Sequence, residues 1–126
     1  MNRHTLGDLQ HAIMRVLWAR GEATSAEVHA ALLPERGLAP TTIATMLRKM
    51  EDKGVVAHRN EGRQFVYRAA VSEQEVRRSM VTEVVERLFA GDPAALVSYL
   101  VADHDLDPEN LARLRAMLAT LEEREG

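Results

Sequence analysis

The sequence predicts a mainly α-helical chain with one small β-hairpin, and three observations support this fold class. Apolar residues recur at helical spacing along most of the chain. Serine, threonine, aspartate or proline opens several of these segments, and glycine closes several of them. The interruption is a pair of β-rich runs, residues 55–59 and 64–69, on either side of a polar turn that contains Gly62. We therefore expect three helices, a hairpin and then further helices.

The first two expected helices span residues 6–20 and 24–33. One face of the first is apolar, and Gly21 supplies its C-terminal stop; the face consists of Leu9, Ala12, Ile13, Val16 and Leu17. The second helix opens with the capping box Thr24-Ser25-Ala26-Glu27. Residues 34–40 (PERGLAP) contain two prolines and one glycine, so we expect a loop there.

The third expected helix, residues 41–53, has two chemically different faces. Its apolar stripe has the spacing i, i+3, i+4, i+7 and consists of Ile43, Met46, Leu47 and Met50. The opposite face carries hydroxyl and basic side chains, among them Thr41, Thr42, Thr45, Arg48 and Lys49. Gly54 ends this helix, and the hairpin follows with Arg59 and Arg63 near its turn.

The second half of the chain predicts three more helices. Ser72 opens the first of them, and apolar residues then repeat every four positions from Val76. Asp92-Pro93 and Asp107-Pro108 each join an N-cap residue to a proline at the first helical position, so they open the other two. We expect two domains, residues 1–70 and residues 71–126.

Composition limits the classes of protein to which the chain can belong. Its 126 residues are 46% apolar and 28% charged, which fits one compact domain or a small domain with an extension. No apolar run approaches the ~20 residues of a membrane helix, and the N-terminus lacks a signal-peptide core, so we expect a cytoplasmic protein. The chain has no cysteine, which excludes disulfides, thiolate metal sites and a cysteine nucleophile.

Catalytic motifs are missing as well, so we expect no enzymatic activity and no cofactor. The sequence contains no glycine-rich phosphate loop after a strand, no HExxH and no GxSxG. The one cluster rich in metal-ligating residue types is Asp103-His104-Asp105. We interpret it as a polar linker before the last helix, and a divalent-metal site remains the alternative.

Charge is divided unevenly between the two halves. Residues 1–70 hold ten Lys or Arg against seven Asp or Glu, a net charge of +3, whereas residues 71–126 hold six against twelve, a net charge of −6. A basic half can bind a phosphate backbone if its cations share one face.

The order of three helices and a hairpin is that of a winged helix-turn-helix. In this fold the third helix enters the major groove and the hairpin, or wing, lies along the phosphates. Hydroxyl and basic side chains suit contacts to bases and phosphates. We therefore expect seven residues to contact double-stranded DNA: Thr41, Thr42, Thr45, Arg48, Lys49, Arg59 and Arg63. The alternative is that this face is merely a solvated helix surface.

Several stretches of the sequence resemble penicillinase repressors of the BlaI/MecI type. They are LGDLQ (residues 6–10) with VLW (16–18), APTTIATMLRKM (39–50) followed by KGVV (53–56), and RQFVYRA (63–69). The C-terminal helices also match in number, length and spacing. The resemblance implies a homodimeric transcriptional repressor, in which each winged helix reads one half-site of an inverted-repeat operator and the later helices interlock across a two-fold axis.

The C-terminal helices carry apolar residues that suit such a dimer. The last helix has leucines at coiled-coil spacing and the helix before it adds two more; the set is Leu96, Leu100, Leu111, Leu114, Leu118 and Leu121. The chain has too little core of its own to bury this stripe, so we expect a second copy to cover it. A helix bundle within one chain is the alternative.

The release of repression has more than one candidate route. Copper-responsive relatives carry Cys-x-Cys motifs, which this chain lacks. Relatives that respond to β-lactams are cut by a sensor protease at an Asn-Phe bond, and the matching position here is Ser98-Tyr99, which keeps the aromatic residue and lacks the asparagine. The alternatives are a winged-helix regulator released by a small molecule, as in MarR or PadR regulators, or by a metal, and a winged helix that binds only protein.

Overall fold

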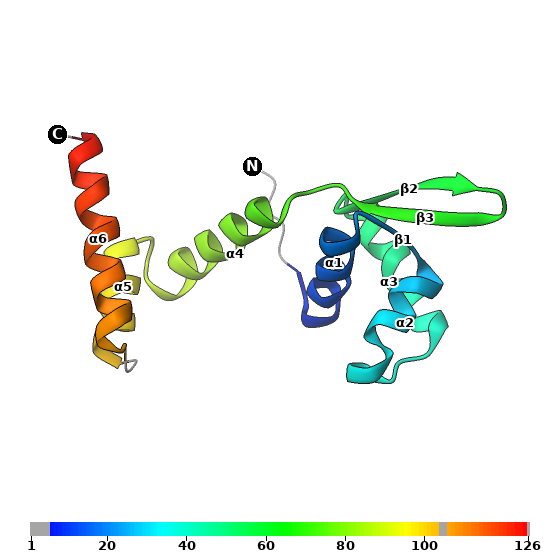
Figure 1. Ribbon diagram of the computed structural model, residues 1–126, viewed down its shortest axis with the longest axis horizontal. Helices are drawn as coiled ribbons and strands as arrows, with labels where there is room; N and C mark the ends of the chain where they lie inside the picture. Colours follow the sequence, from blue (N-terminus) through cyan, green and yellow to red (C-terminus); the bar gives the residue numbers. More distant parts are fainter. Residues whose placement is uncertain (1–5, 104–105, 126) are drawn as a thin grey trace. The chain divides into compact units, whose positions relative to one another are not determined.

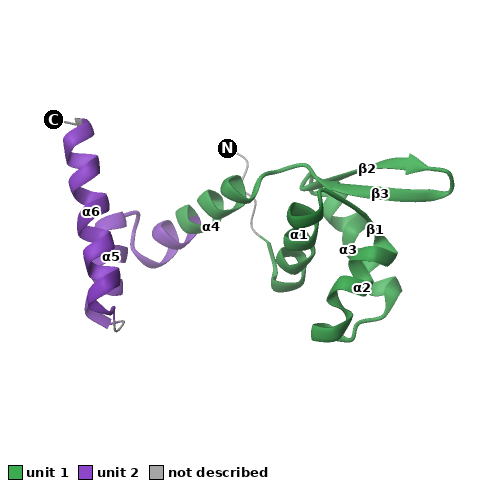
Figure 2. Ribbon diagram, viewed as in Figure 1, with its two compact units in different colours: residues 1–82 green, residues 83–126 purple. Residues whose placement is uncertain are grey.

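The computed structural model describes residues 6–103 and 106–125, which form nine helices and strands (Figure 1). They form two compact units, Met1–Thr82 (unit 1) and Glu83–Gly126 (unit 2), whose boundary lies within a helix, α4 (Figure 2). In chain order the elements are α1 (Asp8–Arg20), β1 (Glu22–Thr24), α2 (Ser25–Arg36), α3 (Pro40–Asp52), β2 (Val56–Glu61), β3 (Gln64–Ala69), α4 (Glu73–Leu88), α5 (Pro93–Asp103) and α6 (Pro108–Glu125). The winged helix-turn-helix predicted from the sequence is confirmed.

Most of the predicted helix starts are confirmed by the hydrogen bonds that cap them. At the start of α2, the Thr24 hydroxyl accepts from the Glu27 backbone N–H at 3.2 Å, and the Glu27 carboxylate accepts from the Thr24 N–H at 2.9 Å. The Asp92 carboxylate accepts from Ala94 N–H at 3.0 Å before α5, and that of Asp107 accepts from Asn110 N–H at 2.8 Å before α6. These bonds satisfy backbone donors that the helices leave unpaired.

The loop predicted for residues 34–40 is wrong in its first part. Helix α2 continues to Arg36 with Pro34 inside it. Proline removes one backbone donor and crowds the carbonyl four residues before it, and in α2 this disturbance is confined to the last turns of the helix. The helix ends at Gly37, which has a φ of 59° and donates its N–H to the Leu33 carbonyl at 3.0 Å. A residue in this left-handed conformation is the usual end of an α-helix.

The wing is a three-stranded antiparallel sheet with the strand order β1-β3-β2. The predicted hairpin is confirmed, with Glu61 opposite Gln64 and only Gly62 and Arg63 between the strands. Gly62 has a φ of 63°, a conformation that favours glycine at a tight turn. The third strand, β1, was not expected; it pairs Ala23 with Tyr67. Three residues are too few to give a periodic signal in the sequence.

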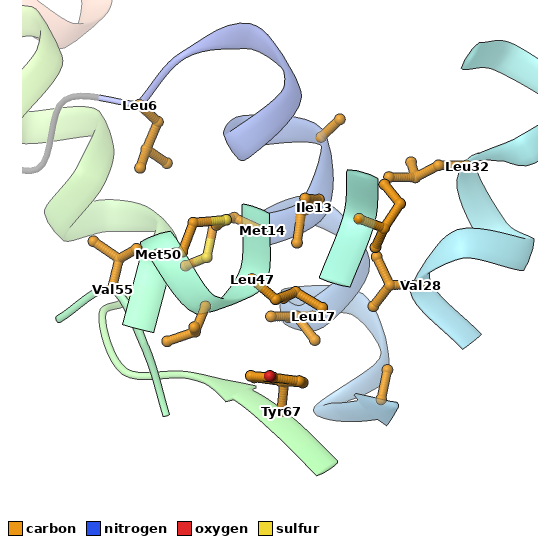
Figure 3. Close-up of a cluster of buried hydrophobic side chains, with 14 of the residues drawn as sticks. Leu6, Ile13, Met14, Leu17, Val28, Leu32, Leu47, Met50, Val55 and Tyr67 are labelled. Atoms are coloured by element: carbon orange, nitrogen blue, oxygen red, sulfur yellow. The ribbon is translucent and has the colours of Figure 1, made fainter. Parts of the chain in front are cut away.

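The core of unit 1 lies between the three helices and the sheet. Figure 3 shows Ile13 and Leu17 of α1, Val28 of α2 and Leu47 of α3 converging near Tyr67 of β3. The start of α4 also belongs to this core through Val71 and Val76, which are 8% and 2% exposed. The Trp18 indole N–H donates to the Val71 carbonyl at 3.0 Å. The compact unit therefore extends past residue 70, into α4.

Unit 2 is built differently, since α5 and the described part of α6 contain no buried residue. Their apolar side chains are only partly covered, as with Leu96, Leu111 and Leu114, or exposed. Within the described residues, no helix is both long enough and apolar enough to cross a membrane.

Candidate nucleic-acid interface

Helix α3 presents the polar face that its sequence predicts. Ile43, Leu47 and Met50 have no exposed surface, which fixes the rotation of the helix about its axis. All five predicted contact residues on the opposite face are exposed: Thr41, Thr42, Thr45, Arg48 and Lys49. Thr41, Thr45 and Arg48 have the spacing i, i+4, i+7, so they form one line along the helix.

Side chains of α1 help to hold α3 in this orientation. Gln10 of α1 donates through Nε2 to the Met46 sulfur at 3.4 Å. The Gln10 amide oxygen accepts from Lys53 Nζ, just after α3, at 3.1 Å. Gln10 therefore contacts both the middle and the end of the α3 segment.

The wing contributes two arginines in different electrostatic settings. Arg63 is exposed at the turn, next to Gly62, and none of the ion pairs between described residues involves it. Arg59 instead forms ion pairs with Glu22 of β1 and Glu61, both at 2.9 Å. The hydrogen bonds that Arg59 donates to these carboxylates raise the pKa of Arg59 above its ordinary value, and the same donation lowers the pKa of Glu22.

These two arginines therefore suit different tasks. The positive charge of Arg59 is balanced by two carboxylates, and its guanidinium links β2 to β1 across the sheet. Arg63 has no such partner in the described part of the chain and is the stronger candidate for a phosphate contact.

An open hollow of about 320 Å³ connects α3 with the wing. Arg48 of α3 and Arg63 of the turn both line it, together with the start of α2 and the aromatic side of β3; the other lining residues are Thr24, Ser25, Ala26, Ala44, Gln64, Phe65 and Tyr67. Two guanidinium groups and the N-terminal end of a helix favour an anionic group such as a backbone phosphate. The hollow therefore joins the two predicted contact surfaces into one.

Sequence reasoning missed Ser25 and Gln64 as members of this surface. Ser25 was recognised as part of a capping box, but its place beside the wing depends on the pairing of β1 with β3. Gln64 was assigned only to a strand, and its proximity to Arg48 depends on how the hairpin packs against α3.

The predicted dimer and cleavage residues of unit 2 lie on partly covered or exposed surface. Leu100, Leu118 and Leu121 are exposed by 39%, 54% and 53%, whereas Leu96, Leu111 and Leu114 are partly covered. Ser98 and Tyr99 lie on α5 and are exposed, and the Tyr99 and Phe89 rings pack in a T-shaped arrangement with their centroids 5.8 Å apart.

The cluster Asp103-His104-Asp105, which the sequence favours as a polar linker, lies only partly within the described residues. Asp103 ends α5, whereas His104 and Asp105 lie outside the described residues. Elsewhere in the described ranges, no three His, Cys, Asp or Glu side chains come together in a way that could hold a metal ion.

The fold and this surface define a winged helix-turn-helix protein of the DNA-binding class. The penicillinase repressor family model matches residues 6–120. The chain therefore belongs to the penicillinase repressor family, of which BlaI and MecI are members, and it is a DNA-binding transcriptional repressor without enzymatic activity.

Individual relatives agree with this assignment. The chain is 33% identical to the transcriptional regulator BlaI of Mycobacterium tuberculosis over 123 residues, which are 96% of this chain and 88% of that protein. It is 26% identical to the penicillinase repressor of Bacillus licheniformis over 113 residues, 90% of this chain and 88% of the other.

A solved structure also shows a relative on DNA. The monomeric form of Bacillus licheniformis BlaI, in complex with the blaP half-operator, is similar to this chain with a TM-score of 0.51 and 31% identity. The similarity covers 59% of this chain and 90% of the other.

Proposed function

We propose that two copies of the chain bind one inverted-repeat operator in the cytoplasm. Each copy reads a half-site through α3 and places its wing along the phosphates, and unit 2 joins the copies. The observation that carries this proposal is the apolar surface of unit 2. In a two-fold dimer the same surface is offered by both partners, so one apolar face covers the other.

The exposed apolar side chains of unit 2 are large and numerous for so small a unit. They range in exposure from 39% to 72% and comprise Val84, Leu88, Val97, Tyr99, Leu100, Val101, Met117, Leu118 and Leu121. A unit of this size buries too little surface to be stable alone, and exposed patches of this kind mark association surfaces. A second copy would supply the missing cover.

DNA geometry then constrains the operator. A dimer that places two α3 helices in successive major grooves requires half-sites about 34 Å apart, or a multiple of that distance. Joining two winged helices also raises affinity, because the second binds at high effective concentration.

The test of the dimer is the substitution Leu118→Glu. A carboxylate introduced at this position would lie unpaired against the partner, at a cost of several kcal/mol, about enough to dissociate the dimer at micromolar concentration. We expect sedimentation to show monomers and DNA binding to fall sharply, while circular dichroism shows that unit 1 stays folded.

Ala116→Glu is the matched control. Ala116 is exposed on the same helix, about 160° around the axis from Leu118 at 100° per residue. It should leave the protein dimeric. A Leu118→Glu protein that sediments as a dimer and binds DNA normally would place the leucine stripe outside the interface and contradict the proposal.

We further propose that a sensor protease ends repression by cutting α5 at Ser98-Tyr99. Both residues are exposed, and a cut there would separate α6, with Leu118 and Leu121, from the rest of the chain. Helical backbone must open locally before a protease can cut it. In cells exposed to a cell-wall antibiotic, the native chain should be shortened and the Ser98→Ala, Tyr99→Ala variant should stay whole.

Release by a small effector is the alternative, and one surface feature offers a candidate binding site for it. An open hollow of about 580 Å³ lies between α1 and α2, lined in part by Arg15, Val16, Trp18, Leu32 and Glu35. If the native chain stays intact while its target genes are induced, cleavage is not the switch and this hollow becomes the better candidate.

A further inference from the structure

A polar and aromatic cluster links the end of α3 to the wing. His58 of β2 contacts both carboxylate oxygens of Glu51 of α3 through Nδ1, at 2.6 and 2.8 Å. The Phe65 ring of β3 stacks on the His58 imidazole with centroids 3.9 Å apart and an angle of 12° between the planes. The side chains of His58 and Glu51 are 25% and 30% exposed, so solvent screens their interaction only in part.

The same cluster adjoins the hollow between α3 and the wing. Phe65 and Tyr67 line that hollow, and His58 lies opposite Tyr67 in the sheet, with ring centroids 5.8 Å apart. Burial and the neighbouring Glu51 carboxylate raise the pKa of Tyr67, while Arg48 lowers it. Glu51 and Arg48 of α3 therefore both lie close to the aromatic side of the wing.

The hairpin needs such a link because most of it lies outside the core. Val56, at the start of β2, is 2% exposed, whereas every residue from Arg59 to Phe65 is exposed. On β3, Val66 and Tyr67 are buried. The Glu51–His58 hydrogen bond attaches the edge strand β2 to α3 at the level of Tyr67, two residues beyond Val56. Loss of this bond would loosen the edge strand β2 beyond Val56, and Arg63 at the turn would move most.

We propose that Glu51 and His58 are positioning residues that set the angle of the wing relative to α3 and so place Arg63 on the DNA backbone when Arg48 reaches the major groove. The inference rests on the proposed use of α3 and the wing. Neither residue needs to touch DNA in this role; each acts through the placement of the arginines on either side of the hollow.

The negative charge of Glu51 makes a positioning role and a direct electrostatic effect predict opposite changes in DNA affinity. Glu51 is an acidic side chain on the helix that faces DNA, so removing its negative charge should strengthen binding if the charge acts only through space. A positioning role predicts the opposite result, because the wing arginine would lose its phosphate contact.

The test measures the affinity of the full-length chain for one duplex as a function of salt. The duplex is the sequence that wild-type protein selects from a random library. For Glu51→Ala we expect an affinity lower by about fivefold, the upper end for a partly exposed ion pair. The slope of log affinity against log salt concentration should fall in magnitude by about 1 for each wing that loses its contact with a phosphate.

Three further variants sharpen the result. Asp52→Ala removes the same charge from the adjacent, exposed position of α3 and should bind as tightly as wild type or more tightly. Glu51→Gln keeps an oxygen that can accept from His58 Nδ1–H and should restore most of the affinity. His58→Ala should match Glu51→Ala, and the double variant should be no weaker than either, because both changes break one interaction.

The outcomes separate positioning from simple stability. The inference would be overturned if Glu51→Ala lost affinity only in proportion to a lower unfolding midpoint and kept the wild-type salt slope. It would also be overturned if Glu51→Ala bound DNA as tightly as Asp52→Ala. A wild-type chain that selected no duplex would overturn the proposed function together with this inference. A wild-type chain that binds, with a Glu51→Ala variant that binds equally, would overturn the inference alone.

Discussion

The start of α4 should determine whether the DNA-binding unit is stable by itself. A fragment ending at residue 70 lacks Val71 and Val76, which are almost fully buried in the core of unit 1, and the Val71 carbonyl that accepts from the Trp18 indole. A fragment ending at residue 82 keeps all three.

The size of the effect follows from these contacts. Burying one valine contributes about 2 kcal/mol, and a hydrogen bond of this kind contributes about 1 kcal/mol. The shorter fragment should therefore be less stable by about 5 kcal/mol, which is comparable with the lower end of the whole stability of a small domain. We expect the fragment of residues 1–82 to fold and that of residues 1–70 to be largely unfolded.

Urea unfolding of both fragments measures this difference. Trp18 is the single tryptophan of the chain, and its indole contacts the segment in question, so its fluorescence reports the transition directly. In the longer fragment, Val76→Ala should cost about 2 kcal/mol and Val81→Ala, at a position 49% exposed, should cost less than about 0.5 kcal/mol. Equal midpoints for the two fragments would show that residues 71–82 are not part of the folding unit.

Further predictions concern the DNA interface. Thr45→Ala or Arg48→Ala should relax sequence preference, each by about 1–3 kcal/mol of discrimination if the side chain contacts a base, as competition between selected and altered duplexes would show. Arg63→Ala should weaken binding to all sequences alike and reduce the salt slope by about 1 for each wing. Arg59→Ala should change the slope by less, because Glu22 and Glu61 already balance its charge; a larger effect than that of Arg63→Ala would contradict our division of their roles.

The parts of the fold that could be predicted are those with local causes. The capping box at Thr24 and the caps at Asp92 and Asp107 act within a single helical turn, and the structure contains all three. The apolar stripe of α3 likewise fixes which face points outward, so the exposure of Thr45 and Arg48 follows from spacing alone.

The parts that could not be predicted depend on contacts distant in the sequence. Strand β1 exists because residues 22–24 meet residues 66–68, and nothing within residues 22–24 indicates that pairing. The ion pair of Arg59 with Glu22 depends on the same strand, so a residue predicted as a DNA contact is found with its charge balanced. The roles of Glu51 and His58 have a similar origin, since sequence assigns one to a helix and the other to a strand.

The strand order β1-β3-β2 has a consequence for how copies of this protein can meet. The two edges of the sheet are a strand of three residues and a strand that ends in Arg59, Asn60 and Glu61. Short edge strands and charged edge side chains both oppose the addition of a strand from another molecule. The wing is therefore protected against edge-to-edge aggregation even though it projects from the core. In the dimer that we propose, association uses the apolar helices of unit 2 instead, where side chains rather than backbone hydrogen bonds would select the partner.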